Sequence, residues 1–111
     1  MSIEHHIDSH CLLAKAQAKS LDASNAGEFR QAMTPLIEQH DRIILDLTAV
    51  EFVDSAGVGT LISCLRAISE RRGELRLCGL NRPVQALFDL MRMHRIFEIH
   101  PDPRSARESL A

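Results

Sequence analysis

The chain has 111 residues, of which 45% are hydrophobic, and its formal net charge is −2. This length and composition favour one domain over residues 1–111 with a single core, and they argue against a disordered chain or a linker-rich array. The 13 basic side chains are balanced by 15 acidic ones, and no Trp or Tyr is available to stack on bases. A nucleic-acid surface is therefore poorly supported, and a protein partner is favoured.

Apolar runs and cysteines bear on the compartment. No run approaches the roughly 20 residues of a membrane span, and the N-terminus lacks the hydrophobic segment of a signal peptide. We therefore expect a cytoplasmic protein without membrane insertion. Cys11, Cys64 and Cys78 are widely spaced and include no Cys-x-x-Cys pair. We expect reduced, mostly buried thiols rather than a disulfide framework or a zinc site.

The first third of the chain predicts two strands and a helix. Residues 3–7 and 12–18 alternate between apolar and polar side chains, which is typical of half-buried strands. Asn25 followed by Glu28 has the spacing of a capping box, and apolar residues then recur at helical intervals. The pattern predicts an amphipathic helix from about 25 to 39.

Two further features precede the middle of the chain. Pro35 lies inside the predicted helix, where it removes a backbone hydrogen bond and clashes with the preceding turn. We therefore expect a kink or a break near Ala32. Residues 42–48 then form a short apolar run bounded by charges, which predicts a strand in the middle of the sheet, covered on both faces.

The second half continues the alternation of helices and strands. Apolar residues from Val58 to Ile68 predict a helix that ends near residues 71–73, and residues 74–79 predict a strand. A helix then starts at Asn81, with Pro83 in its first turn. A brief strand over 96–99 and a terminal helix from about Pro103 follow it. This alternation favours an α/β layered sheet with crossover helices.

Residues 52–59, Phe-Val-Asp-Ser-Ala-Gly-Val-Gly, form the segment that carries chemistry. A strand gives way here to a helix, whose first N–H groups are unpaired and whose dipole is positive at this end. A hydroxyl or a phosphate on Ser55 would therefore lie where anions are tolerated. The small side chains of Ala56 and Gly57 leave that hydroxyl accessible to another protein.

The same segment has simpler interpretations. Asp54 or Ser55 can serve as an N-cap, a role compatible with function, and Gly57 and Gly59 can be tight-packing residues. A lone Gly-x-Gly is too weak to indicate a dinucleotide site, and no Gly-Lys-Ser/Thr follows. A hydrolase nucleophile is disfavoured, because Val53 stands where a nucleophile elbow needs glycine and no histidine is placed as a base.

This segment resembles the anti-sigma factor antagonists, a family of STAS domains (sulphate transporter and anti-sigma factor antagonist). Residues 43–48 and 50–61 are similar to the family's central strand and phosphorylation loop, Leu21-Asp22 to its earlier loop, and residues 95–99 to its last strand. The resemblance implies a single STAS-like α/β domain with its core at about 12–99. Its four- to five-stranded mixed sheet would be packed by about four helices.

The resemblance also implies a partner-switching role without enzymatic activity or a cofactor. The unmodified domain would bind an anti-sigma factor that is itself an ATP-dependent serine kinase. Phosphorylation of Ser55 would release the domain from the anti-sigma factor, and a PP2C-type phosphatase would restore the unmodified domain. Asp54 would lie beside the modified hydroxyl and Asp22 would contribute to the docking surface, together with Ala56, Gly57 and Val58. Family members commonly have Ser or Thr where this chain has Ala56, which leaves Ser55 as the acceptor.

One alternative remains open at this point. A STAS subunit docked on an ABC-type membrane transporter would use the same fold as a scaffold, without modification of Ser55. The ligand-type residues His5, His6, His10 and Cys11 show no recognisable metal spacing, and exposed histidines are the better interpretation. His94 is expected in a solvated loop.

Overall fold

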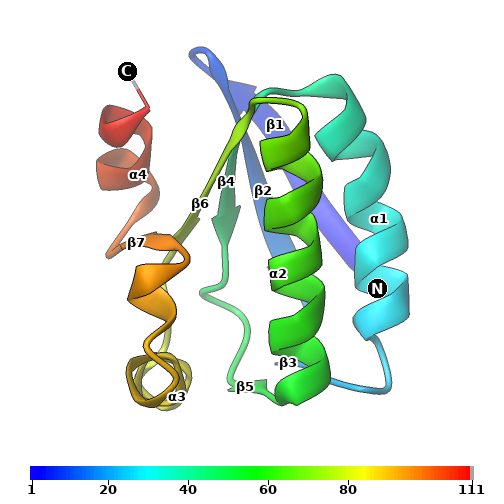
Figure 1. Cartoon of the computed structure of the whole chain (residues 1–111), viewed down its shortest axis with the longest axis vertical. Helices are drawn as coiled ribbons and strands as arrows, with labels where there is room; N and C mark the ends of the chain where they lie inside the picture. The colour runs from blue at the N-terminus through cyan, green and yellow to red at the C-terminus, as the bar shows by residue number, and fades with distance from the viewer. Residues whose placement is uncertain (111) are drawn as a thin grey trace.

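The computed structural model describes residues 1–110 and has a five-stranded sheet in the order β1-β2-β4-β6-β7 (Figure 1). Strand β1 pairs antiparallel with β2, and the other neighbouring strands are parallel. Strands β3 and β5 form a separate two-stranded parallel sheet. The elements are β1 Ser2–Asp8, β2 Cys11–Gln17, β3 Ser20–Leu21, α1 Ala26–Gln39, β4 Arg42–Asp46, β5 Phe52–Val53, α2 Ser55–Glu70, β6 Glu74–Cys78, α3 Arg82–Leu90, a 3-10 helix Met93–Arg95, β7 Glu98–His100 and α4 Pro103–Ser109.

The main core lies between the sheet and the helices α1 and α2, which run side by side on one face (Figure 1). Because successive side chains of a strand point to opposite faces, alternate residues of β2, β4 and β6 enter this core. From the sheet these are Leu12, Ala14, Ala16, Ile43, Leu45, Leu75 and Leu77, and from the helices Phe29, Met33, Leu36, Ile37, Leu61, Cys64 and Ile68.

Helix α4 covers the opposite face of the sheet, over β4, β6 and β7 (Figure 1). A second apolar cluster lies beneath it, formed by Cys11, Ile44, Cys78, Ala106 and Leu110. Strand β4 is therefore covered on both faces, as the uninterrupted apolar run of residues 42–48 predicts. The expectation of buried, unpaired thiols is also confirmed, because all three cysteines are free and buried.

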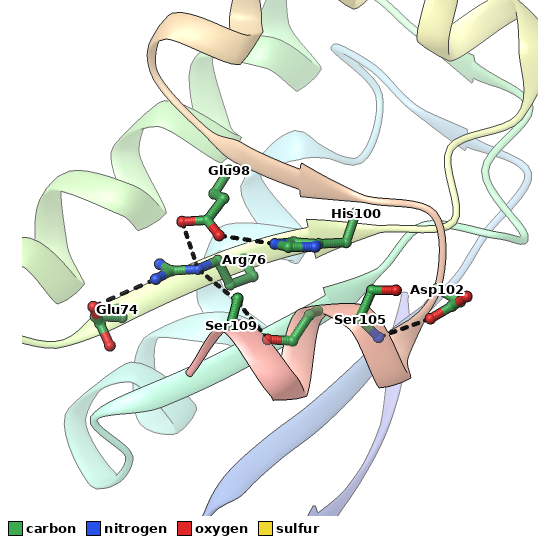
Figure 2. Close-up of polar contacts among 8 residues, drawn as sticks. Glu74, Arg76, Glu98, His100, Asp102, Ser105 and Ser109 are labelled. Carbon is green, nitrogen blue, oxygen red and sulfur yellow. Dashed lines mark hydrogen bonds and ion pairs between the residues drawn. The ribbon is translucent and has the colours of Figure 1, made fainter. Parts of the chain in front are cut away.

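Polar contacts join β6 to the edge strand β7 and to α4 (Figure 2). The Arg76 guanidinium donates to the Ser109 hydroxyl of α4 at 3.2 Å and contacts the Glu98 carboxylate of β7 at 3.0 Å. The imidazole of His100 contacts the other Glu98 oxygen at 2.9 Å. The half-buried Arg76 side chain of β6 therefore joins β7 and α4 on this side of the sheet.

Helix α1 has neither the expected break nor the expected capping box. The helix runs without a break from Ala26 to Gln39 and includes Pro35. The proline is exposed, so its ring and the freed carbonyl group face solvent while the buried side chains on the other face keep the helix packed. The capping box is absent as well: Asn25 is the N-cap residue but makes no side-chain cap hydrogen bond, and Glu28 pairs with the N-terminal ammonium group of Met1 at 2.7 Å.

The remaining differences concern short elements. Strand β3 has no counterpart among the expected elements, because two residues cannot display a period, whereas β5 is the strand expected to give way to a helix within residues 52–59. The last strand lies at Glu98–His100 rather than 96–99, and a 3-10 helix over Met93–Arg95 precedes it. The predicted α/β class, the mixed five-stranded sheet and the four helices are confirmed.

Candidate functional site

The two-stranded sheet brings two distant loops together at one end of the molecule. Ser20 pairs with Phe52 and Leu21 pairs with Val53, so that the chain leaves both strands at the same place. Residues 22–25, named here the Asp22 loop, follow β3, and the start of α2 follows β5. Figure 1 shows β3, β5, α3 and the first turn of α2 at the same end of the structure.

Ser55 is the first residue of α2, and its side chain is exposed. The preceding residue, Asp54, is extended and acts as the N-cap. Helix α2 points its N-terminus towards this surface, so the local backbone field favours negative charge at Ser55. The structure therefore places an accessible hydroxyl at a helix start, where another protein can reach it.

The Asp54 carboxylate joins the two loops. One of its oxygens accepts a hydrogen bond from the backbone N–H of Gly57 at 2.9 Å, which caps α2. The other oxygen accepts from the backbone N–H of Ala23 in the Asp22 loop at 3.1 Å. Both oxygens of this half-buried side chain therefore hold backbone groups from segments about thirty residues apart.

Asp22 is half-buried and organises its own loop. Its carboxylate accepts from the backbone N–H of Ser24 at 2.9 Å and from the Ser24 hydroxyl. The hydroxyl of Ser24, followed by that of Ser20, lowers the pKa of the Asp22 carboxyl below its ordinary value. The Asp22 carboxylate is therefore ionised near neutral pH and adds negative charge to the loop that Asp54 joins to the start of α2.

Gly57 is the position where the helix meets β3. A Cβ atom placed on Gly57 would lie 2.1 Å from the backbone oxygen of Leu21, so no larger residue fits without displacing the strand. Gly57 and Val58 are buried, whereas Ala56 is half-buried and Gly59 is exposed. Of the residues singled out in the sequence, Asp22, Asp54, Ser55 and Ala56 reach the surface and the other two lie beneath it.

Two participants were not singled out from the sequence. Ala23 contributes only its backbone N–H, which no side-chain pattern reveals. Phe52 is 57% exposed, an unusual state for a phenylalanine, and it stands three residues before Ser55. Successive residues of a strand point to opposite faces, and Val53 is buried in β5. This alternation is the one sequence signal that would have predicted an exposed Phe52.

The other candidate residues lie away from this end. His5, His6, His10 and His94 are exposed, as expected. Within residues 1–110, no group of three or more His, Cys, Asp or Glu side chains is arranged to hold a metal ion. Over the same residues, no helix combines the length and the apolar character that crossing a bilayer requires.

The chain is similar in sequence to known proteins. The family model of the STAS domain matches residues 3–106. An anti-sigma F factor antagonist of Paenibacillus polymyxa is 28% identical over 99% of this chain and 93% of its own. An anti-sigma-B factor antagonist of Listeria monocytogenes is 31% identical over 74% of this chain and 73% of its own.

Solved structures share the fold. SpoIIAA, an anti-sigma factor antagonist, superposes in its unphosphorylated form with a TM-score of 0.78 at 17% identity, covering 98% of this chain and 96% of its own. The same protein of Bacillus in its phosphorylated form gives a TM-score of 0.71 at 16% identity, covering 99% of this chain and all of its own.

Proposed function

The chain belongs to the STAS domain family, and on that premise we propose that it is an anti-sigma factor antagonist controlled by phosphorylation of Ser55. In the unmodified state it binds an anti-sigma factor and so releases the sigma factor. The phosphorylated state does not bind. The role is regulatory rather than catalytic, and the protein acts in the cytoplasm.

The observation that carries this proposal is the exposed Ser55 hydroxyl at the start of α2, next to Asp54, which joins that helix start to the Asp22 loop. A phosphate on Ser55 adds about −1.5 to −2 charges beside Asp54. Burying that cluster in an interface costs desolvation energy, and any acidic group of the partner adds repulsion. A combined penalty of about 3 kcal/mol lowers the affinity on the order of a hundredfold, which changes partners without refolding the domain.

The proposed docking surface has an accessible part and a supporting part. Asp22, Asp54, Ser55 and Ala56 offer side chains to the partner, while buried Gly57 and Val58 hold the first turn of α2 in place. The exposed ring of Phe52 adjoins this surface and offers apolar contact area, which is the kind of residue that interfaces favour.

The partner proteins follow from the same proposal. The anti-sigma factor is a serine kinase that supplies the ATP, so the nucleotide belongs to the partner and this chain needs no cofactor. A PP2C-type phosphatase returns Ser55 to the free hydroxyl. SpoIIAA, which has the same fold, has been solved in a phosphorylated and an unphosphorylated form, and this supports a modification of the same kind here.

Binding measurements on two Ser55 variants test the proposal. Ser55→Ala should bind a purified anti-sigma factor of the serine-kinase class as tightly as the wild type and should not be phosphorylated by it with ATP. Ser55→Asp should bind on the order of a hundredfold more weakly, because a carboxylate stands in for part of the phosphate charge. Equal affinity of the two variants would refute the proposal.

A further inference from the structure

Few hydrogen bonds join the Asp22 loop and its flanking residues to the start of α2 and the residue before it, and they can be traced one by one. Backbone pairing of β3 with β5 ends at Leu21, whose carbonyl oxygen accepts from the Asp54 N–H at 3.3 Å. On the far side of the loop, the Thr60 hydroxyl donates to the carbonyl oxygen of Ala26 at 3.3 Å. Between these two points, the Ala23 N–H bond to Asp54 is the hydrogen bond that ties the loop to the helix start.

The rest of the loop is bonded to itself, to β3 and to the first turn of α1, where the carbonyl oxygens of Asp22 and Asn25 accept from the N–H groups of Ala26 and Phe29 at 2.8 and 2.9 Å. The Asn25 side chain accepts from the Asp22 N–H at 2.9 Å and donates to the Ser20 carbonyl oxygen at 2.7 Å. The Asn25 N–H donates to the Asp22 carbonyl oxygen at 3.1 Å, which closes a turn over residues 22–25. These bonds shape the turn and tie it to β3 and α1, but none of them reaches the start of α2.

We infer that Asp54 is a positioning residue that joins the Asp22 loop and the start of α2 into one preformed docking surface. The inference rests on the proposed function for what that surface binds, whereas the bond itself is a property of the isolated chain. A surface whose two halves are already fixed loses less conformational freedom on binding. The bond also keeps the Asp22 carboxylate at a constant distance from Ser55, so that the partner meets one charge pattern.

Two substitutions remove this bond from opposite ends. Asp54→Asn keeps one carbonyl oxygen and replaces the other by an amide donor, so the side chain can accept from Gly57 or from Ala23 but not from both. Ala23→Pro removes the donating N–H and leaves Asp54 unchanged. Ala23 is the second residue of the turn, a position where proline is favoured, so the turn itself should tolerate the change.

A matched control is available in α4, on the opposite face of the sheet from α2 (Figure 1). Asp102 is the N-cap of α4, and its carboxylate accepts from the Ser105 N–H at 2.8 Å (Figure 2). Asp102→Asn therefore alters a helix cap of the same type without touching the Asp22 loop. It reports how much of any effect comes from a weakened cap alone.

The decisive measurement is amide hydrogen exchange by NMR on the isolated chain. In Asp54→Asn and in Ala23→Pro, the Ser24 and Asn25 amides should exchange about tenfold faster than in the wild type, because the loop opens more often. The exchange rates of the double variant should match those of the single variants, since both substitutions remove the same hydrogen bond. Asp102→Asn should leave these amides unchanged. Unchanged exchange in Asp54→Asn and Ala23→Pro would overturn the inference.

Affinity for the purified serine-kinase anti-sigma factor provides the second readout. Asp54→Asn and Ala23→Pro should each weaken binding about tenfold, and Asp102→Asn should not. Retained wild-type affinity in both variants would show that the bond does not position the docking surface. The affinity of Ser55→Asp is measured in the same experiment. If Ser55→Asp binds as tightly as the wild type, the proposed function fails. The hydrogen-exchange result still decides whether Asp54 holds the loop.

Discussion

Gly57 and Gly59 stand two residues apart in α2 but have different surroundings. Gly57 is buried against the Leu21 backbone, whereas a Cβ on Gly59 would meet no atom within 4 Å. Glycine inside a helix normally lowers the stability of the folded protein, because its backbone loses more conformational freedom on folding than that of other residues. The two positions therefore separate a glycine that the site needs from one that the helix merely tolerates.

Alanine at each glycine should have opposite effects. Gly57→Ala forces the first turn of α2 away from β3 and should lower the free energy of unfolding by about 1–3 kcal/mol, a typical overpacking cost. Gly59→Ala should raise it by up to about 1 kcal/mol. Urea unfolding followed by circular dichroism measures both. A stabilised Gly57→Ala variant would contradict the close approach to Leu21.

Residues 52–59 show how far a sequence reaches at this scale. The exposed start of a helix at Ser55 could be predicted, because a strand pattern ends in Asp-Ser and a helical pattern follows it. The second hydrogen bond of Asp54 could not, since its donor at Ala23 lies 31 positions away and is a backbone group. Tertiary contacts of this kind leave no local pattern.

At the scale of elements, Pro35 is the residue that local rules misjudge. The rule that proline breaks a helix assumes that the helix has nothing else to hold it. In α1, the side chains of Leu36 and Ile37 are buried immediately after the proline, and this packing keeps the helix continuous to Gln39. The lost hydrogen bond is consequently a residual cost in a helix that tertiary contacts maintain.

Replacing this proline should recover part of that cost. Pro35→Ala restores an N–H that can donate to the Gln31 carbonyl group, and the free energy of unfolding should rise by about 1–3 kcal/mol. Gln31→Ala, an exposed change on the same helix, should alter it by less than about 0.5 kcal/mol. Thermal unfolding of both variants provides the measurement, and a destabilised Pro35→Ala would show that the proline fits a local distortion.

Long elements with a clear period were predictable, and contacts decided the others. Asn25 has the residue type and spacing of a capping box, yet its side chain bonds to β3 and to the Asp22 N–H instead. Asn and Asp side chains have several backbone partners within reach, so sequence spacing alone does not select one. The two-residue strands β3 and β5, which shape the candidate site, depend wholly on this long-range pairing.

At the scale of the whole molecule, the two layers shield every cysteine. Cys64 lies in the main core, and Cys11 and Cys78 lie beneath α4. Burial raises the pKa of all three thiols, that of Cys78 to about 12. Reaction with a thiol reagent requires an accessible thiolate, and the folded protein provides neither the access nor the charge.

The folded protein should therefore be nearly inert to a disulfide reagent such as DTNB at pH 8. In guanidinium chloride all three thiols should react. Ser63→Cys, which adds a thiol at an exposed position of α2, should react rapidly in the folded state and serves as the control. Rapid reaction of the folded wild-type protein would mean that α4 or α2 leaves its layer often.

Several carboxylates make the stability of the whole molecule depend on pH in the acid range. The pKa of Asp22 is lowered by the Ser24 hydroxyl, that of Glu98 by the hydrogen bond from His100, and that of Asp102 by the Ser105 N–H. A carboxyl group whose pKa is lower in the folded state binds fewer protons there than in the unfolded chain. Its contribution is therefore complete above the ordinary values, 3.8 for Asp and 4.5 for Glu, and is lost as the pH falls through the lowered ones.

Ser24→Ala isolates one of these contributions at the candidate site. The substitution removes the hydroxyl that donates to Asp22 but keeps the backbone N–H bond, so the pKa of Asp22 should move back towards its ordinary value. Wild type should exceed the variant in urea midpoint at pH 7, and the gap should close as the pH falls below about 4 because protonated Asp22 gains little from the hydroxyl. NMR titration of the Asp22 carboxyl in both proteins gives the two pKa values directly. A gap that stays constant down to pH 2.5 would mean that the Ser24 hydroxyl stabilises the loop by a route other than the charge of Asp22.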